Sequence, residues 1–188
     1  MLLLVLAQAG YIEVYFGDES GFSLTPTVPY GWSKKGKQAC ILSQRSPRLN
    51  VFGLLSTGNH LTSYQQQESI TTEFIIECLD DFAQNLPKPT VVVLDNAPMH
   101  KSTLFQAKQA QWEAKGLSIF FLPTYSPHLN RIERLWKQIK CHWLKAQDYL
   151  SFERLKGALN HILTHFGAEF TLHFKELQFN QKLIFYFD

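Results

Sequence analysis

The sequence contains one segment, residues 90–95, whose side chains leave few structural choices. It reads Thr-Val-Val-Val-Leu-Asp, a continuous β-branched and aliphatic run that ends in a carboxylate. Such a run is typical of a strand buried on both faces, as strands are in parallel sheets covered by helices. The segment therefore predicts a central strand of an α/β fold, with Asp95 at its carboxyl end.

Other segments supply the partners that this strand needs. Alternating or continuous apolar runs between turn residues predict strands at 11–16, 36–42, 51–55, 90–95 and 117–122. Longer segments predict helices at 69–86, 102–115, 130–145 and 152–166. Three strands followed by alternating helices and strands favour a mixed five-stranded α/β sheet flanked by helices.

Composition excludes several classes of protein. A length of 188 residues suits one domain, and 18% charged with 14% aromatic residues argues against a disordered chain. Cys40, Cys78 and Cys141 are far apart and form no CxxC pair, so neither a disulfide framework nor a zinc knuckle is indicated. The expected compartment is therefore the reducing cytoplasm. No stretch is apolar enough to span a bilayer, so no membrane partner is expected.

The net charge of +2 conceals an uneven distribution along the chain. Residues 34–48 hold five basic and no acidic residues, whereas residues 68–81 hold five acidic and no basic residues. Residues 131–145 hold five basic residues against the single acid Glu133. Such blocks are usually solvated faces. The alternative, that the basic blocks follow a DNA backbone, depends on where the neighbouring acids lie.

Three carboxylates occupy positions at which an α/β sheet could form an active site. Asp18 has the parity of the buried side of its strand, where a carboxylate is costly unless paired or bound to metal; alternatively, the strand has ended and Asp18 begins a turn. Asp95 closes its strand at the edge where α/β folds bind ligands, or else caps the next helix. Glu133 lies beside the apolar stripe of its helix, or else forms an exposed pair with Lys137.

A cluster of these three acids would favour a divalent cation. Acids without a counter-charge cannot all stay ionised cheaply. Magnesium prefers carboxylate and water oxygens and bridges to phosphates. Two such ions about 3.5–4 Å apart stabilise the attacking and leaving oxygens of in-line phosphoryl transfer. Spacing alone leaves open whether the three acids converge.

Three motifs occur in order around these acids. The first is Phe16-Gly-Asp-Glu-Ser-Gly-Phe22, leading into Pro29-Tyr-Gly-Trp-Ser33, and the second is Val91-Val-Val-Leu-Asp-Asn-Ala-Pro-Met-His100. The third is Leu122-Pro-Thr-Tyr-Ser-Pro-His-Leu-Asn-Arg-Ile-Glu-Arg-Leu-Trp136. Together they resemble the catalytic (DDE endonuclease) domain of a bacterial insertion-sequence transposase of the mariner-like superfamily, over residues 10–165.

That resemblance implies a ribonuclease-H-like fold. Residues 11–166 would form the catalytic domain, after a leader remnant at 1–10 and before a C-terminal tail at 167–188. Asp18, Asp95 and Glu133 would be catalytic and hold two Mg²⁺ ions, for which Mn²⁺ would substitute. The implied activity is cut-and-paste DNA transposition. The implied partners are the transposon ends and target DNA, bound by a homodimer.

The resemblance also implies supporting roles. Asn96 and His100 would support the acids without binding metal themselves, or would contact substrate. For His100, a purely structural role at a helix start is an equal alternative. Asn130 would cap the helix that carries the third acid, as its residue type also suggests. Tyr30 and Trp32 match an aromatic pair that packs in the core or stacks on bases. The lysines expected along the DNA are Lys34, Lys35, Lys137 and Lys140.

Two alternatives to an active transposase domain stay open. Such proteins normally carry helix-turn-helix modules before the catalytic domain, and this chain begins ten residues before its first predicted strand. A truncated, non-catalytic remnant that binds DNA or partner transposase is therefore the first alternative. The second is another ribonuclease-H-like nuclease acting on RNA–DNA hybrids, against which the motif at residues 126–133 counts.

Overall fold

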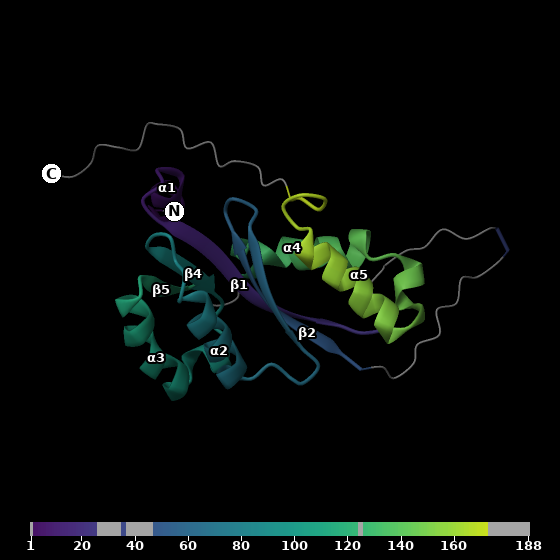
Figure 1. The fold of residues 1–188 in the computed structure, drawn as a ribbon, viewed down its shortest axis with the longest axis horizontal. Coiled ribbons are helices and arrows are strands. Elements are labelled where there is room, and N and C mark those ends of the chain that lie inside the picture. The colour runs from purple at the N-terminus through teal and green to yellow at the C-terminus, as the bar shows by residue number, and fades with distance from the viewer. Residues whose placement is uncertain (1, 26–34, 37–46, 124–125, 173–188) are drawn as a thin grey trace.

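The computed structural model describes residues 2–25, 35–36, 47–123 and 126–172, which form a central sheet with helices on both faces (Figure 1). The strands are β1 (Glu13–Phe22), β2 (Leu49–Ser56), β3 (Leu61–Gln66), β4 (Thr90–Leu94) and β5 (Leu117–Phe121), in the spatial order β3-β2-β1-β4-β5. β1, β2 and β3 pair antiparallel, whereas β1, β4 and β5 are parallel. The predicted mixed five-stranded sheet is confirmed.

Five α-helices accompany the described strands: α1 (Leu2–Gln8), α2 (Thr72–Phe82), α3 (Thr103–Ala114), α4 (Ile132–Gln138) and α5 (Phe152–Thr164). Short 3-10 helices lie at Pro98–Lys101, Pro127–Leu129 and Ala146–Leu150, and a π-helical turn lies at Ile139–Trp143. The side chains of Thr71 and Ser102 accept hydrogen bonds from backbone N–H groups in the first turns of α2 and α3. No helix in the described ranges has the length and apolar character needed to cross a membrane.

Two apolar cores lie on opposite faces of the sheet. One includes Val14 and Phe16 of β1, Val93 of β4, and the inner faces of α4 and α5. The other includes Val92 and Leu94 of β4 and the inner faces of α2 and α3. Because successive side chains of a strand point to opposite faces, the even-numbered residues of β1 share the face that α4 covers.

Residues 2–10 are not separate from this core. Residues 2–8 form α1, and Leu3, Leu4 and Ala7 pack against the core beneath α4 and α5. The backbone N–H of Tyr11 donates to the carbonyl of Leu6 and closes the turn into β1. The described part of the expected leader therefore packs on the core, with α1 ending at Gln8, and the division at residue 10 stays a prediction.

The structure differs from the sequence prediction at three elements. A fourth, the strand predicted at 36–42, stays a prediction, because it lies outside the described residues except for Gly36, which stands in a turn. β3 was not predicted, because its sequence Leu-Thr-Ser-Tyr-Gln-Gln is polar and lies at the sheet edge, half-exposed. The helix predicted at 69–86 is shorter, at Thr72–Phe82. The helix predicted at 130–145 ends at Gln138 and continues as the π-helical turn, in which the N–H of Leu144 donates to the carbonyl of Ile139 at 3.0 Å.

Candidate functional site

The first two acids leave the sheet side by side. β1 and β4 are parallel, and their register ends with Phe16 opposite Val93. Asp18 and Asp95 each stand two residues further along the chain from that pair. Phe16 and Val93 both belong to the core covered by α4, so the alternation of the strands brings Asp18 and Asp95 to that same face and edge.

Asp18 lies within β1, opposite Gly53 of β2, and not in a turn after the strand. Burial raises the pKa of its carboxyl group to about 8, and the charges of Glu19, Glu133 and, less strongly, Asp95 act in the same direction. The sequence alternative that Asp18 begins a turn is therefore wrong. Asp18 is a half-buried acid whose pKa is raised by the charges of the other two acids of the predicted triad.

Glu133 approaches Asp18 from above the sheet. It is exposed in the first turn of α4 and borders the same pocket as Asp18. That pocket has a volume of about 430 Å³ and is lined by Asp18, Glu19, Ser20, Glu133, Trp136, Lys137, Lys140 and Cys141. The structure thus brings the first and third predicted acids to one cavity.

Gly53 explains how α4 can lie so close to β1 and β2. A Cβ atom on Gly53 would stand 2.7 and 2.8 Å from the ring atoms Cη2 and Cζ2 of Trp136 and 3.0 Å from Cδ1 of Ile132. These distances are shorter than van der Waals contact, so only glycine permits this packing. The glycine opposite Asp18 therefore sets the height of Glu133 above the sheet.

Asp95 is held by its own turn and by a buried histidine. Its Oδ1 accepts a hydrogen bond from the N–H of Ala97 at 3.0 Å and lies 3.0 Å from Nδ1 of His100. The side chain is half-exposed, with 51% of its surface accessible. The sequence alternative of a helix-entry cap is thus partly right, because Asp95 does fix the following turn. Both of these contacts use Oδ1, which leaves Oδ2 directed elsewhere.

His100 is bound on both ring nitrogens. It is 1% exposed, and its Nε2 lies 3.0 Å from Oε1 of Glu19. Burial opposes the charge of the ring, but the hydrogen bonds to Asp95 and Glu19 and the charges of both carboxylates outweigh it and raise the pKa of His100 to about 9. Two carboxylate acceptors require two N–H donors, so His100 is an imidazolium at neutral pH.

Sequence reasoning missed Glu19 as part of this arrangement. It follows Asp18 in β1 and therefore points to the other face of the sheet, where His100 lies. A carboxylate inside a strand, next to another acid, was a signal for a buried partner. The partner itself stands 81 residues away and could only be found from the tertiary structure.

Two asparagines connect the elements that carry the acids. Asn130 is 3% exposed, and its Nδ2 donates to the carbonyl of Gly17 at 3.0 Å, beside Asp18. The predicted capping role of Asn130 is wrong: Arg131 holds the N-cap position of α4, and its side chain makes no capping bond. The side chain of Asn130 instead holds the start of α4 to β1. Asn96 donates to the carbonyl of Leu122 and links the ends of β4 and β5.

The lysines predicted along the DNA fall into two groups. Lys137 and Lys140 border the pocket of Asp18 and Glu133. Lys35 is exposed in a turn, whereas Lys34, Tyr30 and Trp32 lie outside the described residues. Burial lowers the pKa of Lys140, as does the positive charge of Arg48, while Asp18 and Glu133 partly restore it. Lys140 therefore stands between an acidic and a basic region.

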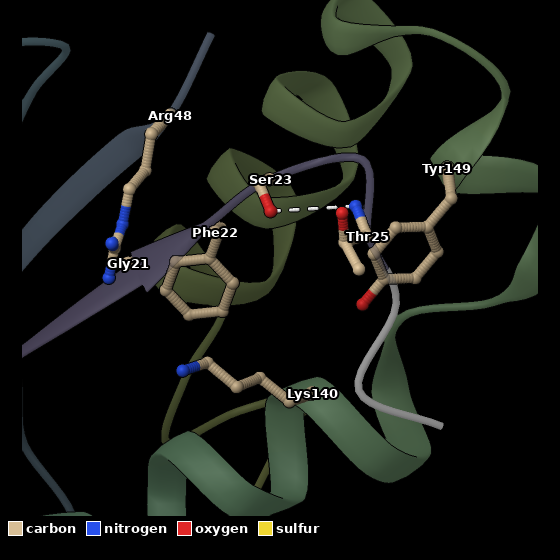
Figure 2. A pocket seen from close by; sticks show the side chains of 7 residues that line it. All are labelled: Gly21, Phe22, Ser23, Thr25, Arg48, Lys140 and Tyr149. Atoms are coloured by element: carbon tan, nitrogen blue, oxygen red, sulfur yellow. Dashed lines mark hydrogen bonds between the residues drawn. The ribbon is translucent and has the colours of Figure 1, made fainter. Parts of the chain in front are cut away.

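A second pocket lies on the basic side of Lys140 (Figure 2). It has a volume of about 280 Å³ and is lined by Gly21, Phe22, Ser23, Thr25, Arg48, Lys140 and Tyr149. Its two cations come from the segment before β2 and from the π-helical turn. The ammonium group of Lys140 stands 5.1 Å from the centre of the Phe22 ring, at the end of β1. Two cations and several hydroxyl groups around one cavity favour an anion.

Comparison with known proteins gives a consistent result. A family model described as DDE superfamily endonuclease matches residues 13–156. The insertion element IS630 uncharacterized 39 kDa protein of Shigella sonnei is 25% identical over 131 residues, which are 67% of this chain and 37% of that protein. The chain therefore spans little more than a third of this curated relative. The match confirms the resemblance to insertion-sequence proteins.

Solved structures agree at the level of the fold. The Mos1 mariner paired end complex with Mn superposes with a TM-score of 0.59 at 14% identity, covering 90% of this chain and 53% of that one. The catalytic domain of Mos1 mariner transposase gives a TM-score of 0.53 at 13% identity, with 87% and 76% covered. The predicted ribonuclease-H-like fold is confirmed by these matches.

Proposed function

The chain belongs to the DDE superfamily of endonucleases, and from this premise we propose that it catalyses divalent-metal-dependent cleavage and strand transfer of DNA during transposition. The observation that supports the proposal is the placement of three acids, in β1, directly after β4 and in α4, near one edge of the sheet. Asp18 and Glu133 share a pocket, and the charges of Glu133 and Asp95 both act on Asp18.

The donor set fits a hard divalent cation. Carboxylate oxygens are the ligands that Mg²⁺ and Mn²⁺ prefer. Burial raises the pKa of Asp18, and the negative charges of Glu19, Glu133 and Asp95 raise it further, so a bound cation would stabilise its ionised form. Asp18, Asp95 and Glu133 would hold two Mg²⁺ ions, with Mn²⁺ as a substitute. When bound, such ions activate water and stabilise the attacking and leaving oxygens of a phosphodiester.

The protein's own groups would position the acids and the substrate. His100 holds Oδ1 of Asp95, and Asn130 holds α4 to the backbone beside Asp18. In the first reaction, water attacks a phosphodiester and releases a 3′-hydroxyl. In the second, that hydroxyl attacks target DNA, so a new 3′-oxygen–phosphorus bond forms as the target's own bond breaks. A homodimer on paired transposon ends would present both ends to one target.

The basic side of the site would bind the DNA backbone. Arg48 and Lys140 border the anion pocket at the end of β1, and Lys137 lies beside Glu133. A phosphate bound between Arg48 and Lys140 would lead the adjacent phosphodiester toward Asp18, because Lys140 borders both pockets. Lysine and arginine contacts to phosphate position DNA without reading its sequence. Lys34 and Lys35 would extend this track.

The proposal is tested with the purified chain, a supercoiled plasmid and a labelled duplex that has a free 3′-hydroxyl. With Mg²⁺ or Mn²⁺ we expect nicked plasmid and covalent transfer of the label. Glu133→Gln should reduce both by at least about 100-fold, because removal of one member of a catalytic set removes most of its effect. The matched control is Glu153→Gln, since Glu153 is an exposed acid in the first turn of α5.

Two results would contradict the proposal. DNA binding without cleavage or transfer under either metal would favour the non-catalytic remnant. Preferential cleavage of the RNA strand of a hybrid, without transfer of the label, would favour a nuclease of RNA–DNA hybrids.

A further inference from the structure

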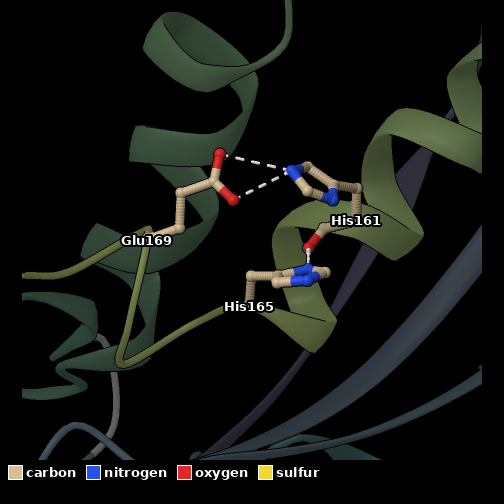
Figure 3. A group of neighbouring side chains, drawn as sticks. All are labelled: His161, His165 and Glu169. Atoms are coloured by element: carbon tan, nitrogen blue, oxygen red, sulfur yellow. Dashed lines mark hydrogen bonds and ion pairs between the residues drawn. The ribbon is translucent and has the colours of Figure 1, made fainter.

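A second group of potential metal ligands lies at the end of α5 (Figure 3). His161 stands in the last turn of the helix, His165 is its C-cap residue, and Glu169 follows in the next turn. One ligand atom from each of the three side chains lies within 4.8 Å of those of the other two. All three side chains are exposed, so an ion and its water ligands could reach them.

Local structure explains why the three side chains meet. Residues four apart on a helix share one face, which places His165 directly after His161, with their ring centres 4.3 Å apart. Gly167, at φ 91°, then reverses the chain. The backbone N–H groups of residues 168, 169 and 170 all point to the carbonyl of His165, at 3.0 to 3.3 Å. This compact turn brings Glu169 back against His161.

The contacts of both rings are compatible with coordination. Nδ1 of His165 lies 2.8 Å from the carbonyl oxygen of His161, to which it donates, so Nε2 is the nitrogen of His165 left for an ion. Such a bond from the second ring nitrogen is the usual support of a metal-binding histidine. Nε2 of His161 lies 3.2 Å from Oε1 and 3.1 Å from Oε2 of Glu169. Ligand atoms about 2.0–2.1 Å from a tetrahedral zinc ion stand roughly 3.3 Å apart, close to that spacing.

We propose that His161, His165 and Glu169 bind a zinc ion, with solvent completing the coordination. Two imidazole nitrogens and one carboxylate select late first-row divalent ions over Mg²⁺, which prefers oxygen ligands. An exposed histidine–glutamate pair alone contributes little to stability. A shared ion, by contrast, would connect the last turn of α5 to the segment that follows it.

The segment after α5, residues 166–172, packs against the rest of the protein, and a bound ion would support that packing. Trp143 packs against both Phe166 and Phe170, and Leu172 is buried in the core with α4 and α5. The side chain of Asn59, in the turn between β2 and β3, donates to the carbonyl of Leu172 at 2.8 Å. Zinc at the turn would therefore hold residues 166–172 against the sheet. This role is independent of the acids at the other site.

Isothermal titration of the full chain with ZnCl₂ in excess MgCl₂ tests the proposal. The Glu133→Gln variant should keep this binding event, because its change lies at the acidic edge. His161→Ala and His165→Ala should each weaken zinc binding by at least about tenfold, since even indirect supports of metal ligands are worth 10–100-fold. The matched control is His142→Ala, because His142 is an exposed histidine of the π-helical turn. Zinc should raise the melting temperature of the wild type and of His142→Ala, but not of His165→Ala.

Circular dichroism of the metal-free variants checks that they fold. Equal zinc affinity in the wild type and the His161→Ala/His165→Ala double variant would overturn the proposal. An equally large fall in zinc affinity in His142→Ala would overturn it as well, because zinc would then bind exposed histidines without selection.

Discussion

The Nε2 atom of buried His100 lies 3.0 Å from Oε1 of Glu19, and the opposite nitrogen of the same ring lies 3.0 Å from Oδ1 of Asp95. One imidazolium thus joins two carboxylates from neighbouring strands. Its single positive charge is shared between Glu19 and Asp95, whereas Asp18 and Glu133 share their pocket with the half-buried Lys140. The negative charge of Asp18, Asp95 and Glu133 that these cations leave unbalanced lies on the side where a divalent metal would bind.

Replacing His100 by alanine should weaken both folding and catalysis. The change leaves two carboxylates near a buried cavity, so we expect the free energy of unfolding to fall by about 2–3 kcal/mol. Asp95 is also left without its support, and metal-dependent cleavage should fall by about 10–100-fold. Urea unfolding and plasmid nicking measure the two effects. Glu19→Gln, which keeps an oxygen acceptor for Nε2, should have the smaller effect on both; a larger effect from Glu19→Gln would contradict this explanation.

Asp18→Asn should stabilise the metal-free protein at alkaline pH. The pKa of Asp18 is about 8 when folded, against an ordinary value of 3.8. A carboxyl group whose pKa is higher in the folded than in the unfolded state contributes fully to stability below its unfolded pKa. That contribution is lost as pH rises through the folded pKa. At pH 9 with EDTA, the free energy of unfolding of the variant should therefore exceed that of the wild type by at least about 1 kcal/mol. The gain should shrink toward pH 4.

Magnesium provides the control for that experiment. Added Mg²⁺ should stabilise the wild type more than Asp18→Asn, because an ion that binds only the folded state adds to its stability. An Asp18→Asn protein less stable than the wild type at pH 9 in EDTA would show that Asp18 is already neutralised by the protein.

Gly53→Ala should separate α4 from the sheet. The added Cβ would stand 2.7 Å from the Trp136 ring, and such overpacking costs about 1–3 kcal/mol of unfolding free energy. Because α4 carries Glu133, its shift should also reduce cleavage by up to about 100-fold. Gly157→Ala is the matched control, since a Cβ at that helical position meets nothing within 4 Å. It should stabilise α5 by about 0.5–1 kcal/mol and leave cleavage unchanged.

The sequence predicted those parts of the site that depend on local pattern. The continuous apolar run at 90–94 indicated a buried strand with Asp95 at its end, and period-two parity placed Asp18 on the buried side of β1; both agree with the structure. The apolar stripe of residues 132–139 likewise indicated which face of α4 packs inward. Each of these inferences needed only the geometry of one element.

Contacts between different helices and strands could not be predicted from the sequence. Asn130 has the residue type of a helix cap, but a carbonyl of β1, 113 residues away, takes its side chain instead. The pairing of His100 with Glu19 depends on the parallel pairing of β1 with β4 and not on any motif. β3 lacked an apolar signal because an edge strand needs few buried side chains. Tertiary contacts decided all three.

The anion pocket between Arg48 and Lys140 gives the last prediction (Figure 2). If both cations bind backbone phosphate, Arg48→Ala and Lys140→Ala should each weaken binding to duplex DNA regardless of its sequence. Each should also reduce the slope of log affinity against log salt by about 1, because a protein with one cation fewer on the phosphates releases one counterion fewer on binding. Fluorescence anisotropy at a series of KCl concentrations measures the slope. Lys115→Ala is the control, since Lys115 is exposed at the end of α3, on the other face of the sheet. A salt slope unchanged in Arg48→Ala and Lys140→Ala would mean that the pocket takes no phosphate; an equal decrease in Lys115→Ala would mean that binding follows net charge alone.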